Sequence, residues 1–514
     1  MRTDFDAYIR EHTTLRKKIA ADFFAALKKR SAKSWKSVSR VERMSVFKEA
    51  VKAVPAYAKF LKAHNVRPSS IKTEDDFRSL PPMTKANYLR AYPLTERIVK
   101  NRRADTAPIV FTATSGSTGE PVYFPRNHIL DLQSSMYHEL IFRNAGITPG
   151  DSTLVIVGFG MGVWIGGVIT YEAVKTMGER GYNISVITPG SNKTEIFAAL
   201  KHIAKNYKHV VICGYPPFIK DLVDEGPSAG VRWKTFKSLK FVCAAEMFTE
   251  RFRDYLMRKT GMKNPLRDIT NIYGSADLGT MAVETPLAIL IRRLALKNRR
   301  VYKRLFTDAN RLPTLAQFHP DFIAFEASGR SLFLTGYNSV PLIRYEIGDH
   351  GGVFDYRDAE KIFAIEGVNL RSEAKKAGIA DTITELPFVY VYERSDFSTK
   401  LYGAIIWPEH VREALMEKSL QKEITGRFTL ITRHDGRHNE YLEVNIELRG
   451  TKPRSRTLQK RLLKHVTEGL LAKNAEYTYL THHMPTRVIP RIVLWPREHP
   501  LHFRAGIKQK WIKK

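Results

Sequence analysis

The sequence predicts an α/β fold, with a large N-terminal domain of helix-covered sheets followed by a small C-terminal α+β domain. Three observations support this prediction: the chain length, an alternation of short apolar runs with helix-length segments, and a change of pattern near residue 396. At 514 residues the chain exceeds what one hydrophobic core usually supports. We therefore expect a large domain over residues 1–395 and a small, mobile domain over residues 396–514.

Two hydrophobic periods predict the elements of the large domain. Residues 1–100 carry apolar side chains spaced by three and four, which predicts a helical N-terminal part. From Ile109 onward, short apolar runs alternate with helical stretches, and this is typical of a parallel sheet covered by helices. The clearest predicted strands are TLVIVGF from Thr153, NISVITP from Asn183, HVVICGYP from His209 and LKFVCAAE from Leu239.

The predicted small domain combines the apolar spacing typical of helices with the short apolar runs typical of strands. Its predicted elements are the strand-like KLYGAIIW from Lys400, a helix from Pro408, a hairpin-like segment from Phe428 to Leu448 and an amphipathic helix from Arg456.

One uncharged stretch, residues 153–170, is long enough to cross a bilayer. Five glycines interrupt it, so we expect a buried strand, a glycine turn and the start of a buried helix there. Cys213 and Cys243 are too few for a disulfide framework, and the N-terminus lacks a continuous apolar stretch. These features predict a cytoplasmic protein.

The charge balance predicts a surface that attracts polyanions. Lysine plus arginine outnumber aspartate plus glutamate by 83 to 52, which gives a net charge of +31. The excess is spread along the chain, without a helix-turn-helix, zinc-finger or aromatic RNA-binding pattern. We therefore expect no sequence-specific nucleic-acid partner, although a nucleic-acid function based on charge alone stays open.

A hydroxyl- and glycine-rich loop interrupts the apolar segment from Phe111 to Phe124. Serine and threonine hydroxyls together with exposed amides suit phosphate oxygens, and glycine allows their close approach. The spacing differs from that of a Walker loop, and a flexible surface turn is the alternative interpretation. The loop residues are Thr114, Ser115, Gly116, Ser117, Thr118 and Gly119.

Two later segments add candidate side chains for a nucleotide. In NIYGSADLGTMAVE a strand is expected to end at Tyr273, whose ring could stack on a purine, and an acid four residues later could bind Mg²⁺. In SVPLIRYEIGDHGG an acid follows an apolar strand and could hold a ribose diol, or it could cap a turn. The loop positions are Gly274, Ser275 and Asp277 in the first segment, and Arg344, Tyr345, Gly348 and Asp349 in the second.

In this order, the three segments resemble the adenylate-forming superfamily, most closely its phenylacetate-CoA ligase-like branch. That branch carries a TSGSTG-type loop, a YGxxE-type motif and an RYxxGD-type motif. The likeness covers roughly residues 50–425 well and about the last 90 residues loosely. Further similar segments are LPPMTKANY from Leu80, CGYPPFIKDL from Cys213, CAAEMFTERFRDYL from Cys243 and ERSDFSTKLYGAIIWPEHVREAL from Glu393.

The resemblance implies a role for each candidate residue. The loop from Thr114 to Gly119 would hold the β- and γ-phosphates of ATP, with Gly274 and Ser275 alongside in the nucleotide site. Asp277 stands where the family has a glutamate that contacts Mg²⁺, and Asp349 would hold the ribose hydroxyls. The adenine would be framed by Ala245, Glu246 and Tyr273.

The hinge and the C-terminus complete the implied site. Arg394 would contact the nucleotide, Ser395 or Asp396 would be the pivot between domains, and Gly403 would lie beside the channel for the pantetheine arm of CoA. Lys508 is the implied catalytic lysine with Lys510 as the alternate, unless the tail is simply a solvated basic segment. The sequence departs from the family at Glu120, where a lysine is usual, and it lacks the zinc-binding cysteines of some relatives.

The implied reaction is the AMP-forming activation of a carboxylic acid. ATP and Mg²⁺ are the implied cofactors, and CoA is the acyl acceptor that the resemblance favours. An amine or a protein acceptor, or a non-catalytic nucleotide-binding protein, stays open. An apolar or aromatic acyl group is suggested by Phe159, Trp164 and Tyr215 in the expected pocket walls.

An insertion-like stretch, residues 286–306, combines an apolar stripe with basic residues. It could be a solvated helix over the core, a peripheral contact with anionic lipid, or a lid for a greasy or acidic substrate. The stripe consists of Leu287, Leu290, Ile291, Leu294, Val301 and Leu305. The basic residues around it are Arg292, Arg293, Arg299, Arg300, Lys303 and Arg304.

Overall fold

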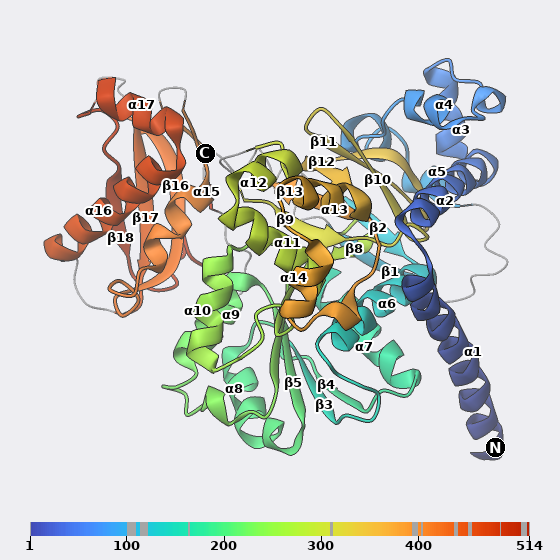
Figure 1. The fold of residues 1–514 in the computed structure, drawn as a ribbon, viewed down its shortest axis with the longest axis horizontal. Helices are drawn as coiled ribbons and strands as arrows, with labels where there is room; N and C mark the ends of the chain where they lie inside the picture. The colour runs from blue at the N-terminus through green and yellow to red at the C-terminus, as the bar shows by residue number, and fades with distance from the viewer. Residues whose placement is uncertain are drawn as a thin grey trace.

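The computed structural model shows an α/β protein with a large mixed sheet (Figure 1). It describes the chain apart from residues 1, 100–108, 114–121, 163–164, 309–311, 393–398, 402–403, 436–439, 451–454, 484, 505–510 and 513–514. The fold class predicted from the sequence is confirmed. The predicted boundary between residues 395 and 396 lies outside the described residues.

The four predicted strands form the parallel half of the large sheet. They pair in the order β4, β3, β5, β6, and β7 extends the parallel run. Nearly every side chain of β3 and β5 is buried, as expected when helices cover both faces of a sheet. The bounds are β3 (Thr153–Val157), β4 (Ile184–Ile187), β5 (His209–Gly214), β6 (Leu239–Ala244) and β7 (Ile269–Ser275).

The other half of the sheet is antiparallel, so the predicted parallel pattern holds for one half only. The full strand order is β10-β11-β12-β13-β9-β8-β7-β6-β5-β3-β4. Short turns such as residues 276–278 join consecutive strands here, and a connection of that length cannot make a parallel crossover. The bounds are β8 (Gly279–Val283), β9 (Thr314–Gln317), β10 (Ile323–Ser328), β11 (Ser331–Gly336), β12 (Leu342–Phe354) and β13 (Phe388–Tyr392).

Helices cover the sheet and connect the parallel strands. Residues 153–170 form β3, a loop and the start of a helix, as expected, with residues 163–164 outside the description. Within the described residues, no helix combines the length and apolarity needed to span a membrane. The helices are α6 (His128–Asn144), α7 (Ile165–Glu179), α8 (Lys193–His202), α9 (Pro216–Glu225), α10 (Glu250–Thr260), α11 (Pro286–Lys297), α12 (Arg299–Leu305), α13 (Tyr356–Ile365) and α14 (Leu370–Lys376).

Helices make up most of residues 2–97. The helix α1 extends away from the rest of the molecule toward the N-terminus (Figure 1). Arg43 of α2 ties this part to the sheet, because its guanidinium pairs with Glu74 at 2.7 Å and with Glu326 of β10 at 3.0 Å. The elements are α1 (Arg2–Lys29), α2 (Ala32–Ala53), α3 (Pro55–Ala63), η1 (Pro68–Ser70), α4 (Glu74–Ser79), η2 (Lys85–Leu89) and α5 (Leu94–Arg97).

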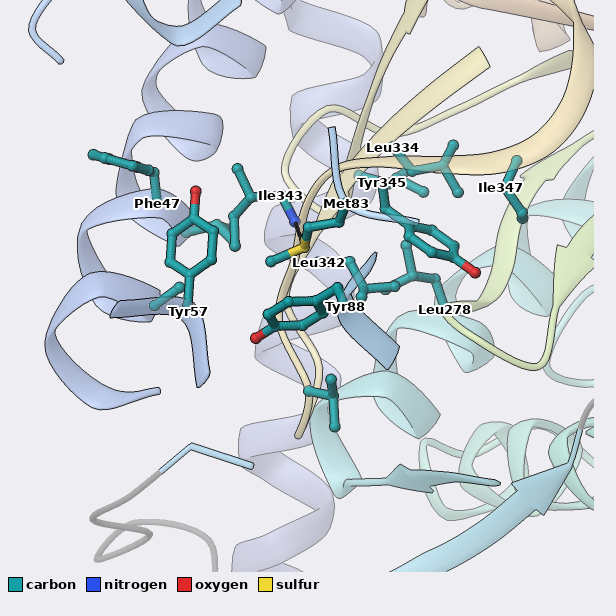
Figure 2. Packing of buried hydrophobic residues seen from close by; sticks show 14 of the residues in the cluster. Phe47, Tyr57, Met83, Tyr88, Leu278, Leu334, Leu342, Ile343, Tyr345 and Ile347 are labelled. Atoms are coloured by element: carbon teal, nitrogen blue, oxygen red, sulfur yellow. Dashed lines mark hydrogen bonds between the residues drawn. The ribbon is translucent and has the colours of Figure 1, made fainter. Parts of the chain in front are cut away.

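The segment LPPMTKANY docks on the antiparallel half of the sheet. Met83 pairs with Tyr345 of β12 in a parallel bridge, and its carbonyl accepts a hydrogen bond from the Glu346 amide at 2.8 Å. The Met83 sulfur lies 3.2 Å from the Ile343 amide nitrogen (Figure 2). Met83 and Tyr345 belong to one buried cluster, which joins the N-terminal helices to β12.

The C-terminal part has a sheet and a hydrophobic core of its own. Its strands β16, β17 and β18 form a three-stranded sheet, in which β17 and β18 are parallel. The core cluster draws on residues 401–511 alone among those described. The elements are β14 (Thr399–Leu401), β15 (Ala404–Ile406), α15 (Pro408–Arg412), η7 (Ala414–Met416), β16 (Ile424–His434), β17 (Glu440–Leu448), α16 (Arg456–Lys473), α17 (Ala475–His483) and β18 (Arg491–Trp495).

Candidate functional site

The hydroxyl- and glycine-rich loop lies outside the described residues, but the strands that flank it are placed. The strands β1 (Val110–Ala113) and β2 (Tyr123–Arg126) form an antiparallel pair, with Ala113 opposite Tyr123. Thr112 is 1% exposed, and its hydroxyl donates to the Ala276 carbonyl at 3.3 Å. The chain therefore enters this loop beside the turn that follows β7.

The segment around Tyr273 forms a tight hairpin instead of a strand followed by a loop. The strand β7 continues through Gly274 and Ser275, with a bulge after Tyr273, and it pairs with β8. The prediction that Gly274 and Ser275 lie in a loop is therefore wrong. A Cβ on Gly274 would lie 2.6 Å from the Gly279 carbonyl oxygen, so this close approach of the two strands requires glycine.

Asp277 lies in the turn of this hairpin and is 2% exposed. Its backbone carbonyl accepts a hydrogen bond from the Asn338 side-chain amide at 2.8 Å, which fixes the turn against the loop before β12. Mg²⁺ binds one or two protein carboxylates together with phosphate oxygens, so the Asp277 carboxylate is of the chemical kind that could contribute to such a site.

Tyr273 and Asp349 meet although 76 residues separate them. The tyrosine hydroxyl donates to a carboxylate oxygen of Asp349 at 2.6 Å, and Asp349 is 7% exposed. Asp349 lies within β12, so its predicted position after a strand is wrong. Gly348 precedes it with φ +84°, a backbone conformation that favours glycine.

Arg344 and Tyr345, from the same motif, lie in the body of the fold. Arg344 pairs with Glu326 at 3.1 Å and also donates to the Leu80 carbonyl. Tyr345 is fully buried in the cluster of Figure 2. These two residues therefore hold β12 in place.

The loop after β6 brings two more candidates to the same edge of the sheet. Ala245 is exposed and has φ +72°, the left-handed conformation that residues other than glycine rarely adopt. Glu246 is 9% exposed, and its carbonyl accepts from the Asn271 side chain of β7 at 3.0 Å. The carboxyl ends of β6 and β7 therefore lie next to each other.

The expected acyl pocket is partly described. The rings of Phe159 and Tyr215 pack edge to face with centroids 5.2 Å apart, while Trp164 lies outside the described residues. Burial, together with the nearby Glu246 carboxylate, raises the pKa of Tyr215. An aromatic wall thus follows β3 and β5, close to the loop that contains Glu246.

The remaining predicted site residues lie outside the part of the chain that the structure describes. They are Arg394, Ser395, Asp396, Gly403, Lys508, Lys510 and the loop Thr114, Ser115, Gly116, Ser117, Thr118, Gly119 with Glu120.

The C-terminal part docks on this edge through Glu246 and through residues that the sequence analysis did not single out. Lys220 of α9 donates to the Thr425 carbonyl at 2.7 Å, and Trp511 donates from its indole nitrogen to Glu246 at 3.3 Å. A cavity of about 30 Å³ between the two parts is lined by these residues and by Arg412. Contacts between residues so far apart in sequence leave no local pattern by which they could be predicted.

Charge pairs between α9 and the C-terminal part strengthen the same contact. Arg449 of the C-terminal part pairs with Asp224 of α9 at 2.8 Å, and Arg497 pairs with Glu225 at 2.5 Å. Burial alone raises the pKa of Asp224, but Lys220 and Arg449 outweigh burial and hold it below its usual value. Asp224 is therefore a negative charge between two cations.

The apolar stripe of residues 286–306 packs inside the protein. Five of its six members are at most 8% exposed, and Leu294 is partly buried against the same clusters. Arg292, predicted to surround the stripe, is 1% exposed and pairs with Glu284 at 2.9 Å. Any contact with anionic lipid would therefore depend on the exposed basic residues of α12, not on the stripe.

Solved structures share this architecture, although no family model and no curated sequence matches the chain. A 2-hydroxyisobutyryl-CoA ligase in the postadenylation state, in complex with 2-HIB-AMP, superposes with a TM-score of 0.65 at 14% identity, covering 95% of this chain and 90% of that chain. An acyl acid amido synthetase in complex with 2,4-DB superposes with a TM-score of 0.56 at 11% identity, covering 94% and 90%. The chain therefore has the fold of the adenylate-forming enzymes.

Proposed function

We propose that this chain activates a carboxylic acid with ATP as an acyl-adenylate, releases pyrophosphate and passes the acyl group to the thiol of CoA. The observation that carries the proposal is the hydrogen bond between Tyr273 and Asp349 beside the turn that Thr112 contacts. It joins two of the three segments that resemble the nucleotide-binding motifs of adenylate-forming enzymes, and the hydrogen bond from Thr112 to Ala276 joins the strand before the third segment to the same hairpin. The fold is also that of enzymes solved with acyl-adenylates.

In the first half-reaction a carboxylate oxygen attacks the α-phosphorus of ATP and the pyrophosphate leaves. Because two anions must meet, the protein has to position them and compensate their charge. The loop from Thr114 to Gly119 would hold the β- and γ-phosphates, and Asp349 would accept hydrogen bonds from the ribose hydroxyls. Mg²⁺ at Asp277 would supply positive charge beside the phosphates, and Lys508 would meet the α-phosphate and the carboxylate.

In the second half-reaction the thiol attacks the acyl carbonyl carbon and AMP leaves. CoA is the proposed acceptor because the resemblance points to a CoA ligase branch and a CoA ligase shares the fold. The fold is shared with an amido synthetase as well, which makes an amine the second candidate acceptor. The acid site would lie between Phe159 and Tyr215, whose packed rings favour an apolar or aromatic acyl group.

Two further proposals accompany this function. We place the boundary between a large and a small, mobile domain at residues 395 and 396, within the segment that resembles the family's hinge. A cytoplasmic setting is supported by the free thiols of Cys213 and Cys243, which are buried on neighbouring strands.

The test is acid-dependent exchange of labelled pyrophosphate into ATP, over a panel of aryl, fatty and polar acids. We expect exchange with one class of acid, and a loss of about a hundredfold in Asp349→Ala and Lys508→Ala, the range typical of one preorganised polar group. Asp75→Ala, at an exposed position of α4, is the matched control and should exchange normally.

Each outcome of this screen has a distinct meaning. Acid-dependent exchange followed by AMP release on addition of CoA supports the proposal, whereas release only with amines moves the acceptor to the second candidate. ATP binding without exchange for any acid would point to a non-catalytic nucleotide-binding protein. A normal rate in Asp349→Ala would remove the proposed ribose contact.

A further inference from the structure

The loop between β6 and α10 is held in a strained conformation. Ala245 has φ +72°, which brings the Cβ of an alanine too close to the following carbonyl oxygen and is unfavourable relative to a right-handed conformation. Such strain persists only where surrounding contacts fix the backbone, and it is concentrated at functional sites. The contacts that fix this loop therefore indicate what its conformation depends on.

Hydrogen bonds reach the loop from both parts of the molecule. On the sheet side, the Asn271 side chain donates to the Glu246 carbonyl at 3.0 Å. From the C-terminal part, Arg412 donates to the Met247 carbonyl at 3.1 Å, and the Trp511 indole nitrogen donates to a Glu246 carboxylate oxygen at 3.3 Å. The two residues after Ala245 are thus both bound by the C-terminal part.

Arg412 and Trp511 are themselves rigidly built into the C-terminal core. Trp511 is 4% exposed and packs on Phe428 with ring centroids 4.8 Å apart, and its carbonyl accepts from the Leu430 amide at 2.7 Å. The Arg412 guanidinium lies 4.5 Å from the centroid of the Trp511 ring, a cation–π arrangement. The two side chains therefore fix each other's orientation where they contact the loop.

We propose that Trp511 and Arg412 are positioning residues that hold the loop Ala245–Met247 in the conformation, left-handed at Ala245, that binds adenine. The inference rests on the proposed function, because the resemblance behind that function assigns adenine to this loop. Adenine affinity then depends on docking of the C-terminal part, and by reciprocity a bound nucleotide favours docking. Preorganising a loop in its bound conformation raises affinity because the ordering cost is met before binding.

The first test is calorimetric titration of the full chain with ATP and Mg²⁺, without an acid. Trp511→Phe keeps an aromatic ring in the core and removes the N–H donor, and we expect the Kd for ATP to rise about ten- to a hundredfold, the range for a buried hydrogen bond to a charged group. Trp495→Phe is the matched control, because the Trp495 indole nitrogen donates to Asn445 within the C-terminal part at 2.5 Å.

A rescue distinguishes positioning from a general structural role. Glycine adopts the left-handed conformation without the steric cost that alanine pays. Ala245→Gly should therefore restore most of the ATP affinity that Trp511→Phe loses. Loss of affinity through misfolding of the C-terminal part would not be rescued by a change in the loop. Absence of rescue would overturn the proposal.

A second experiment measures directly how the C-terminal part docks on the large part. Spin labels at Leu296→Cys of α11 and Lys464→Cys of α16, both exposed, report the distance between the two parts while the native cysteines are buried. We expect Trp511→Phe, but not Trp495→Phe, to broaden the distance distribution and ATP to narrow it again. An unchanged distribution in Trp511→Phe overturns docking through this residue. Absence of ATP binding by the unmodified chain would overturn the proposed function and the adenine part of this inference. The distance between the spin labels would then still show whether Trp511 holds the C-terminal part against the large part.

Discussion

His138 is a buried, neutral histidine in the middle of α6. It is 1% exposed, its ring lies 2.8 Å from the Ser134 carbonyl through Nδ1, and burial lowers its pKa to about 4. In the unfolded chain the pKa returns to about 6.5. Stability from the neutral ring is therefore complete above pH 6.5 and is lost as the pH falls toward 4.

We expect His138→Gln to remove this pH dependence. Between pH 6.5 and pH 4, the free energy of unfolding of the unmodified chain should fall by about 3 kcal/mol more than that of His138→Gln. Each pKa unit corresponds to about 1.4 kcal/mol. Urea unfolding at a series of pH values measures the difference. His128→Gln, at an exposed position of the same helix, is the control. Parallel pH curves for His138→Gln and the unmodified chain would contradict the assignment.

At the residue scale, the sequence indicated which side chains to examine but not which ones meet. Tyr273 and Asp349 were both candidates because of their motifs, yet their hydrogen bond depends on how β7 and β12 are brought together by the whole sheet. Trp511 was not a candidate, because a tryptophan near a C-terminus has no motif until its partner Glu246 is known. Local sequence patterns indicate which side chains could take part in the chemistry, whereas the packing of the whole fold decides which of these side chains meet.

The hairpin of β7 and β8 is the element on which the proposed nucleotide site depends most directly. Gly274→Ala would place a Cβ 2.6 Å from the Gly279 carbonyl oxygen, and backbone on both strands would have to move. We expect a loss of about 1–3 kcal/mol in the free energy of unfolding, the usual cost of overpacking. The same shift displaces Tyr273 and Asp277, so ATP affinity should fall as well.

Urea unfolding and ATP titration of the same protein preparation measure both effects. Gly150→Ala is the control, because a Cβ there has no atom within 4 Å. Normal ATP affinity in Gly274→Ala would show that nucleotide binding does not depend on the conformation of this hairpin.

At the element scale, buried parallel strands were the easiest elements to predict. The runs that became β3, β5 and β6 are short, continuous and apolar, which is the pattern of strands covered on both faces. The strand β12 was expected to stop before Asp349, because polar residues and Gly348 follow its apolar start, but it continues to Phe354 by pairing with β11 and β13. Hydrogen bonding to neighbours overrode local composition there.

At the scale of the whole molecule, the contact between the two parts depends on a charge that is almost completely buried. The Asp224 side chain is 4% exposed and pairs with Lys220 at 2.7 Å and with Arg449 at 2.8 Å. Removing one member of a buried pair leaves an uncompensated charge, at a cost of about 3–5 kcal/mol. We expect Asp224→Asn to release the C-terminal part, because exposing Arg449 to water is then the cheaper arrangement.

Small-angle X-ray scattering measures this release as an increase in the radius of gyration. The control is Asp254→Asn, which breaks a partly exposed pair with Arg293 within the large part. An unchanged radius of gyration in Asp224→Asn, with a lower free energy of unfolding, would show that the charge stabilises α9 without holding the two parts together.

The parallel half of the sheet has one edge at which the proposed chemistry gathers. The loops after β3, β5, β6 and β7 all leave from the carboxyl ends of parallel strands, and they carry Phe159, Tyr215, Glu246 and Asp277. Among the residues that the structure describes, the loops at the opposite ends of these strands contribute none of the proposed site residues. The described residues proposed for chemistry at this edge lie in loops, whereas buried strands form the sheet, so a substitution in one of these loops can change the chemistry without changing the architecture.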